Sequence, residues 1–356
     1  MRGFTLVELL VAMVLGLVLI GGALNMVLTS RNTLRVNDNV MRLQESARTA
    51  FEILARDLRE TGQIPCGIAD TPVSLLQIGN VIRDPKTSAV RPWWADWEGG
   101  TLRAWDAATD TPGIVAFGTG TAQRVNGTAA ILTLQASGTE YTIQAHDPTA
   151  HEFTLDRVSG LAANDLLVAC DLSSAALFQA ATVSTSLNTV DYSAASTTYN
   201  CSDNLGAPTP ANCATVPAKT FPANGTGIVT PLRMAFWYVG YNGNGGKSLY
   251  RAWVKPDNTG TAVLAPDEIV AGVNNLEVKL LTVDLTNASA PALASNWVAP
   301  STITDWSKNA LNQVIGVKVK LWLSTQESVG TNPASVPIER QLEHVIKLRN
   351  REALLP

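Results

Sequence analysis

The chain begins with residues whose types and spacing suit a proteolytic cut followed by an ion pair. Gly3 precedes Phe4, and Glu8 follows Phe4 by four residues. Cleavage between Gly3 and Phe4 would give Phe4 a free α-amine. Glu8 would then lie at the helical spacing that brings two groups onto one face. We expect its carboxylate to pair with that amine, in the same chain or in a neighbouring chain of an assembly.

Glu8 lies in a segment that is otherwise apolar. It is the only charged side chain from Phe4 to Leu28, a stretch longer than the ~20 residues that a helix needs to cross a membrane. A charge near the middle of such a span costs about 3 kcal/mol on insertion scales, so we expect Glu8 to have a partner. Arg2 and the initial amine mark the cytoplasmic side, which places the remainder outside the cytoplasm.

Residues Gly3 to Glu8, read together with the apolar segment behind them, resemble the class III signal of type IV pilins and type II secretion pseudopilins. The resemblance implies cleavage between Gly3 and Phe4 by the prepilin peptidase and N-methylation of Phe4. It implies that Glu8 neutralises the amine of a neighbouring subunit as a filament grows. It also implies a pilin fold, with a long N-terminal helix packed on an antiparallel β-sheet head.

Two other interpretations of the N-terminus stay open. Small residues, Gly21 to Ala23, end the apolar stretch, so a conventional signal peptidase could cut after Ala23. The segment could also be a plain signal anchor in which Glu8 is incidental. A mature chain that begins at Leu24 would support the first of these, and a methylated Phe4 would argue against both.

The segment after the apolar span has the pattern of an amphipathic helix. Apolar residues recur at steps of three and four, as on a helix that lies against a core. Oppositely charged residues lie four apart on the other face, and Gly62 with Pro65 predicts the end of the helix. The predicted rod from Phe4 to Thr61 would be about 87 Å long. The apolar positions are Val40, Leu43, Ala47, Ala50, Phe51, Leu54 and Leu58, and the charge pairs are Asp38/Arg42, Arg48/Glu52, Glu52/Arg56 and Arg56/Glu60.

Beyond Gly62 the patterns indicate β-strands, so the predicted class is α+β. Residues 131–134 and 141–143 flank Gly138 and predict a hairpin. Alternating apolar positions predict strands near 276–280 and 317–323. The predicted organisation is a leader (1–3), a transmembrane helix (4–28), a stalk helix (29–62) and a periplasmic head (63–356) with a long Ser/Thr/Asn-rich loop at about 184–230.

The chain has four cysteines, Cys66, Cys170, Cys201 and Cys213. An even number in a chain expected to be exported predicts two disulfides. Three connectivities are open, and we favour Cys66–Cys170 with Cys201–Cys213. No Cys-x-x-Cys pair occurs, which argues against a zinc or redox site.

A cluster of tryptophans is the one group of side chains that could bind a protein partner or a glycan. Trp93, Trp94 and Trp97 lie close together, with Trp105 beyond them. Packing in the core is the favoured interpretation. An interface with another minor pilin through Trp93, Trp94 and Trp97 is the second, and a glycan or surface ligand is the third.

No other cluster predicts catalysis, a metal or a cofactor. The glycine-rich stretch 240–246 lacks the ending of a phosphate-binding loop, so we expect a hairpin tip. No nucleophile elbow occurs. One histidine-rich and acidic stretch matches no familiar metal motif, and we expect solvated turn residues with metal binding as the less favoured alternative: His146, Asp147, His151, Glu152 and Asp156.

Composition and later motifs narrow the expected partners. The formal net charge is −4 and only 16% of residues are charged, so nucleic acid is not indicated as a partner. No catalytic constellation occurs, so a small-molecule substrate is not indicated either. Later motifs resemble PilW-type minor pilins, which are similar to J-type pseudopilins: Arg59–Gly62, Ala169–Gln179, Trp237–Gly240, Ser248–Arg251, Ile269–Val273, Trp306 and Leu348–Asn350. The resemblance implies a subunit of a priming complex at the pilus tip, with other minor pilins and the major pilin as partners. The alternatives are a J-type pseudopilin, a pilus-tip adhesin and, least favoured, a membrane-anchored enzyme.

Overall fold

The computed structural model describes most of the head and nearly all of the predicted rod. The described residues are 5–68, 76–83, 91–109, 111, 114–136, 138–194, 198–207, 213–223, 225–256, 262–287, 289–325 and 337–354.

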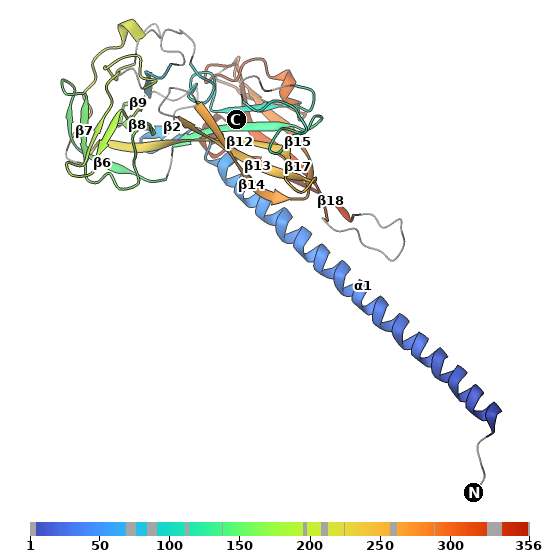
Figure 1. Ribbon diagram of the computed structural model, residues 1–356. Helices are drawn as coiled ribbons and strands as arrows, with labels where there is room; N and C mark the ends of the chain where they lie inside the picture. Colours follow the sequence, from blue (N-terminus) through green and yellow to red (C-terminus); the bar gives the residue numbers. More distant parts are fainter. Residues whose placement is uncertain are drawn as a thin grey trace.

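A single long helix leads from the N-terminus into a β-rich head (Figure 1). Helix α1 (Leu6–Arg59) has 54 residues, which corresponds to about 80 Å. Shortly after the end of the helix, Gly62 adopts a φ of 75°, a left-handed conformation that glycine reaches without strain. Gly62 then donates its N–H to the Leu134 carbonyl at 2.9 Å. The predicted α+β class with one N-terminal helix is confirmed.

The strands of the described residues form three sheets. The smallest pairs β1 (Gln63–Ile64) with β2 (Gly67–Ile68), directly after the helix. The twelve-stranded sheet contains β3 (Gln77–Asn80), β4 (Leu102–Trp105), β5 (Ala130–Ala136), β6 (Tyr141–Asp147), β7 (Glu152–Leu155), β8 (Leu166–Cys170), β9 (Ser174–Gln179), β10 (Thr182–Ser184), β11 (Thr189–Asp191), β12 (Ile228–Tyr241), β13 (Lys247–Pro256) and β14 (Ala262–Ala271). The four-stranded sheet contains β15 (Val273–Asp284), β16 (Ala292–Leu293), β17 (Asn312–Ser324) and β18 (Glu339–Lys347). The pairing is antiparallel except between β3 and β9. Short 3₁₀ helices follow the chain at Cys213–Thr215, Pro300–Thr302 and Arg349–Leu354.

Strand β12 joins two lobes of the head. Its first part, Ile228 to Pro231, pairs with β6 and β8. Its second part, from Leu232 onward, pairs with β5 and β13. We call the part built on β3 and β6–β11 the outer lobe. We call the part built on β4, β5 and β13–β18, with the end of α1, the helix-side lobe. Figure 1 shows α1 meeting the head beside β14 of the helix-side lobe.

The predicted hairpin between residues 131–134 and 141–143 is wrong. Strands β5 and β6 follow one another along β12 instead of lying side by side. Ala136 of β5 pairs with Leu232, and Tyr141 of β6 pairs with Val229. Both strands therefore run in the same direction past β12. The residues around Gly138 carry the chain from one lobe to the other instead of reversing it.

Regular structure occurs both just before the predicted loop at about 184–230 and inside it. Strand β9 pairs with β8, and all of its residues except Ser174 are buried. Strand β11 falls inside the predicted loop and pairs with β7 and β10. The Ser- and Thr-rich composition hid the short apolar runs that form these strands.

Helix α1 packs on the head with the predicted apolar stripe. Leu43, Ala50, Leu54 and Leu58 are buried in one cluster with side chains of both large sheets. A second cluster fills the junction between the lobes, and a third fills the outer lobe around Phe153. The helix is therefore held by its last few turns, and the rest of it projects away from the head.

Candidate assembly site

The carboxylate of Glu8 caps the N-terminus of α1. Its Oε2 accepts from the backbone N–H and the hydroxyl of Thr5, each at 3.0 Å. The Glu8 N–H donates to the Thr5 hydroxyl oxygen at 3.3 Å. This is a reciprocal capping box, which satisfies donors that a helix start leaves without partners. Gly3 and Phe4, the residues of the predicted cut, lie outside the described residues.

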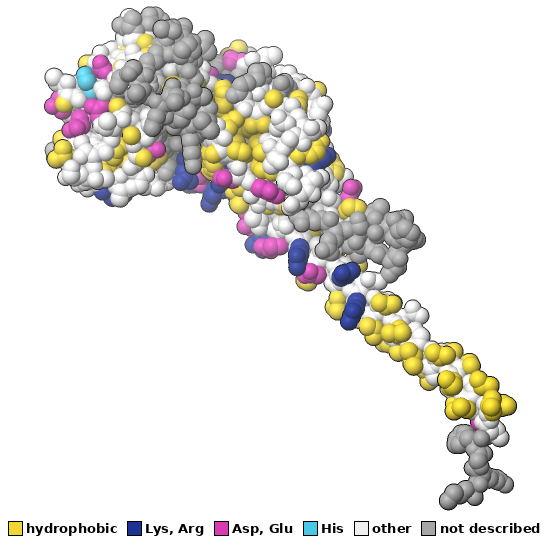
Figure 2. All heavy atoms as spheres, viewed as in Figure 1, with side chains coloured by type: hydrophobic (Ala, Val, Ile, Leu, Met, Phe, Trp, Pro, Cys, Tyr) yellow, Lys and Arg dark blue, Asp and Glu magenta, His cyan; other side chains and the backbone are white. Residues whose placement is uncertain are grey.

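Around this carboxylate, α1 exposes apolar side chains on every face. Leu6 is 75% exposed, Leu19 74% and Met26 78%. Within the described part of the chain, α1 is the helix that is long and apolar enough to cross a membrane, and no part of its apolar window is buried in the head. Figure 2 shows hydrophobic side chains covering the distal part of the helix, and the lysine and arginine side chains of the helix lie nearer the head. Such a surface requires lipid or other helices around it.

Nearer the head, α1 becomes charged on its outer face. Arg42 pairs with Asp38 at 3.1 Å, and Arg48 pairs with Glu52 at 2.8 Å. All four side chains are more than half exposed, so each pair contributes at most about 1 kcal/mol. These pairs were predicted from their spacing, and they lie on the part of α1 nearer the head.

A buried acid joins the end of α1 to the sheet. Asp57 is 2% exposed, and its Oδ2 accepts from the Trp237 indole N–H at 3.0 Å. The guanidinium of Arg251 lies 3.7 Å from the same oxygen and 4.0 Å from the centre of the Trp253 ring. Trp237 and Arg251 are direct neighbours across β12 and β13. Burial raises the pKa of Asp57, against the opposing attraction of the Arg251 charge.

This Asp57 cluster was missed by the sequence reasoning, although a signal was present. Asp57 follows Leu54 by three residues and Ala50 by seven, which places it on the stripe that faces the core, where an acid is unusual. Its partners fall in two of the motifs that resemble minor pilins, 237–240 and 248–251. The structure therefore gives these motifs a role in fixing the helix to the head.

The tryptophans of the predicted cluster differ in burial. Trp94 and Trp97 are each 1% exposed and pack in the junction cluster, where Trp94 contacts Tyr199 edge-on with 5.0 Å between ring centres. Both are inaccessible in the folded head, as the favoured core interpretation expects. Trp93 is half-buried and keeps some accessible surface.

His146 is half-buried in strand β6 of the outer lobe, and the expectation that it is a solvated turn residue is wrong. Its ring stacks on Phe153 with 4.2 Å between centres. Its Nδ1 accepts from the Phe221 N–H at 3.0 Å, and its Nε2 lies 2.8 Å from the Tyr192 hydroxyl. Burial lowers the pKa of His146 to about 4. Across the described ranges, no group of three or more His, Cys, Asp or Glu side chains is arranged to hold a metal.

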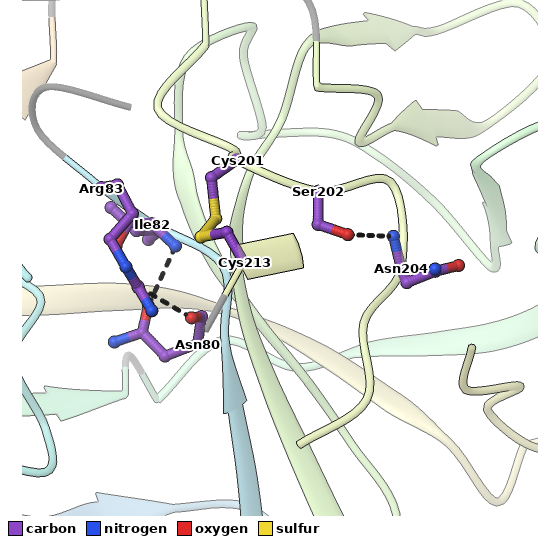
Figure 3. Close-up of a disulfide and its surroundings, with 7 residues drawn as sticks. All are labelled: Asn80, Ile82, Arg83, Cys201, Ser202, Asn204 and Cys213. Carbon is purple, nitrogen blue, oxygen red and sulfur yellow. Dashed lines mark hydrogen bonds between the residues drawn. A yellow bond between two sulfur atoms is a disulfide. The ribbon is translucent and has the colours of Figure 1, made fainter. Parts of the chain in front are cut away.

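The four cysteines form two close pairs. Cys201 and Cys213 are joined by a disulfide, with 5.8 Å between their Cα atoms. Figure 3 shows this bond beside Arg83, whose Nη1 donates to the carbonyls of Asn80 and Ile82 at 3.0 and 2.7 Å. Cys66 and Cys170 are thiols, and their side chains hydrogen-bond to each other. A disulfide between Cys66 and Cys170 stays a prediction.

Comparison with known proteins bears on the N-terminus. Residues 1–24 match the family model described as the prokaryotic N-terminal methylation motif. The chain carries a prepilin-type N-methylation motif. No curated protein and no solved structure matched the chain. The motif and the single apolar helix support a membrane-anchored, type IV pilin-like protein. Such a pilin or pseudopilin subunit is processed by the prepilin peptidase and assembles with other pilins, which suggests a structural subunit and not an enzyme.

Proposed function

We propose that this protein is a minor pilin of a type IV pilus, of the PilW type, and part of the tip complex that primes pilus assembly. The observation that carries the proposal is the methylation motif at residues 1–24, continued by a helix whose apolar side chains are exposed all round. The motifs at 169–179, 237–240 and 248–251 support the PilW type. The protein is held in the inner membrane with a periplasmic head and then moves to the tip of the pilus.

The shape of the head supports a place at the end of a filament. Figure 1 shows lobes extending to both sides of the point where α1 enters. Closely packed repeats of such a subunit along a filament would bring neighbouring heads into collision. A subunit at the tip has no head in front of it, so this constraint is weaker there.

Glu8 provides the recruitment step. Within the single chain, its carboxylate accepts from Thr5. A neighbouring subunit that has been cleaved after its leader presents a charged amine at the same depth. An ion pair in lipid is not screened by water, so the carboxylate favours the amine over the hydroxyl. This exchange brings the two helices into register.

The test is to replace Glu8 and follow two separate properties. Glu8→Ala should leave the protein in the membrane fraction, because the apolar surface of α1 is unchanged. It should lose co-purification with other minor pilins and reduce piliation at least tenfold. Glu45→Ala is the matched control, because Glu45 is also an acid on an exposed face of α1 but lies beyond the apolar segment. Normal piliation and co-purification of Glu8→Ala would contradict the proposed role.

The identity of the co-purifying subunits distinguishes a subunit of a type IV pilus from a subunit of a type II secretion system. A J-type pseudopilin of type II secretion would have the same N-terminal motif and the same exposed helix. Recovery of secretion-system subunits with the full-length protein, in place of pilus subunits, would replace the PilW assignment. Mass spectrometry of the mature protein is the companion measurement, and a methylated Phe4 is the expected first residue.

A further inference from the structure

Two cysteines meet where the helix joins the head. Cys66 lies in the tight connection between β1 and β2, shortly after the end of α1. Cys170 is the last residue of β8 and is 1% exposed. Cys66 is half-buried against the hydrophobic cluster that contains Cys170, and the two thiols hydrogen-bond. The sulfur atoms are therefore already neighbours in the folded chain.

We propose that Cys66 and Cys170 form a disulfide in the exported protein and that this bond carries tension from α1 directly into the twelve-stranded sheet of the head. The proposal rests on the proposed function in one respect, since it requires the head to fold in an oxidising compartment.

Beyond the packed turns of α1, short non-covalent contacts hold the chain to the head. After Arg59 the chain is held by the hydrogen bond from Gly62 to Leu134 at 2.9 Å and by one from the Asn350 side chain to the Thr61 carbonyl at 2.7 Å. The β1–β2 pair is only two residues long on each side. Once the packed turns of α1 are pulled from the head, the pull therefore acts next on these short elements.

The cross-link would move that load to a much stronger element. Strand β8 is hydrogen-bonded to β9 on one side and to β12 on the other, and its five residues are all buried. With a Cys66–Cys170 bond, force from α1 reaches β8 after the first turn beyond the helix. The roughly 100 residues between the two cysteines are then bypassed.

The chemistry needs an oxidant, and a disulfide compound of an exported compartment supplies it. This is oxidised glutathione or a protein thiol–disulfide oxidoreductase, written R–S–S–R. The Cys66 thiolate attacks one sulfur, forms a mixed disulfide and releases one R–SH. The Cys170 thiolate then attacks the Cys66 sulfur, closes the bond and releases the second R–SH. Both thiol protons leave, and the electron pair reduces R–S–S–R.

The order of these steps follows from the surroundings of the two sulfurs. The hydrogen bond with Cys66 and burial raise the pKa of the Cys170 thiol, which leaves little thiolate to start the reaction. Cys66 has accessible surface and is therefore the thiol that meets the oxidant. Cys170 resolves the mixed disulfide from inside the fold.

The first test maps disulfides in the full chain purified from membranes. Free thiols are alkylated before lysis, and peptides are analysed without reduction. We expect Cys66 linked to Cys170 and Cys201 linked to Cys213. Alkylated Cys66 and Cys170 together with an intact Cys201–Cys213 bond would overturn the cross-link and leave export standing. Four alkylated cysteines would overturn the cross-link and the oxidising location of the head together.

The second test measures the mechanical role by pulling single molecules between the N- and C-termini. The oxidised wild type should release roughly 350 Å less contour length than Cys170→Ser, since about 100 residues at ~3.5 Å each stay closed. Cys66→Ser and the double variant Cys66→Ser/Cys170→Ser should match Cys170→Ser. Cys201→Ser is the control, because its short loop should add only a small extension. Equal contour lengths for the wild type and Cys170→Ser would overturn the proposal.

Discussion

At the scale of single residues, Asp57 decides how firmly α1 is attached to the head. The carboxylate is buried and accepts from Trp237 beside Arg251. We expect Asp57→Ala to destabilise the head by about 2 kcal/mol, below the 3–5 kcal/mol of a fully buried pair because Arg251 is partly exposed. Asp57→Asn should cost less, since an amide oxygen can still accept from the indole. Urea unfolding followed by tryptophan fluorescence gives both values.

An exposed acid on the same helix provides the comparison for Asp57. Glu52 pairs with Arg48 on the outer face of α1, where both side chains are largely exposed. Glu52→Ala should change the free energy of unfolding by no more than about 0.5 kcal/mol. Similar losses for Asp57→Ala and Glu52→Ala would show that the buried contact does not hold the helix.

His146 makes the outer lobe sensitive to acid. Its pKa is about 4 in the fold and about 6.5 in an unfolded chain. Between pH 4 and pH 6.5 the unfolded chain binds more protons at this histidine than the folded chain does. The contribution of neutral His146 to stability is therefore complete above pH 6.5 and is lost as the pH falls toward 4. Melting temperatures at pH 7.5 and 4.5 should therefore differ more for the wild type than for His146→Gln. Parallel pH dependences of the two proteins would contradict this role.

At the scale of elements, α1 is held by side chains near its C-terminal end. Leu54 is fully buried between the helix and both large sheets, so Leu54→Ala should cost about 2–5 kcal/mol of head stability. Met41 is 61% exposed on the same helix, so Met41→Ala should leave head stability unchanged. Urea midpoints of the two variants test this. A large loss for Met41→Ala would mean that the head contacts the helix further out than the structure shows.

The sequence was sufficient for the elements whose pattern is local. Steps of three and four residues, with a glycine at the end, located α1 to within two residues at each end. Simple alternation located the strands around Val278 and Val319, which became β15 and β17. The capping contact between Thr5 and Glu8 was not anticipated, although a spacing of three residues is that of a capping box.

Pairings that depend on distant residues could not be predicted in the same way. Strands β5 and β6 were each recognised, but both pair with β12, which lies about 90 residues further along the chain. The glycine between β5 and β6 resembles a hairpin turn, which favoured the wrong pairing. His146 was misread because its burial comes from Phe153, Tyr192 and Phe221, which lie on other segments. Asp57 was missed because its partners lie on β12 and β13.

At the scale of the whole molecule, one strand belongs to both lobes. Val229 of β12 is buried in the outer-lobe cluster, and Trp237 of the same strand is buried against α1. Neither lobe can lose its half of β12 without disturbing the other. The head should therefore melt as one cooperative unit, and the calorimetric enthalpy should equal the van't Hoff enthalpy. Two resolved heat-absorption peaks would show that the lobes are thermodynamically independent.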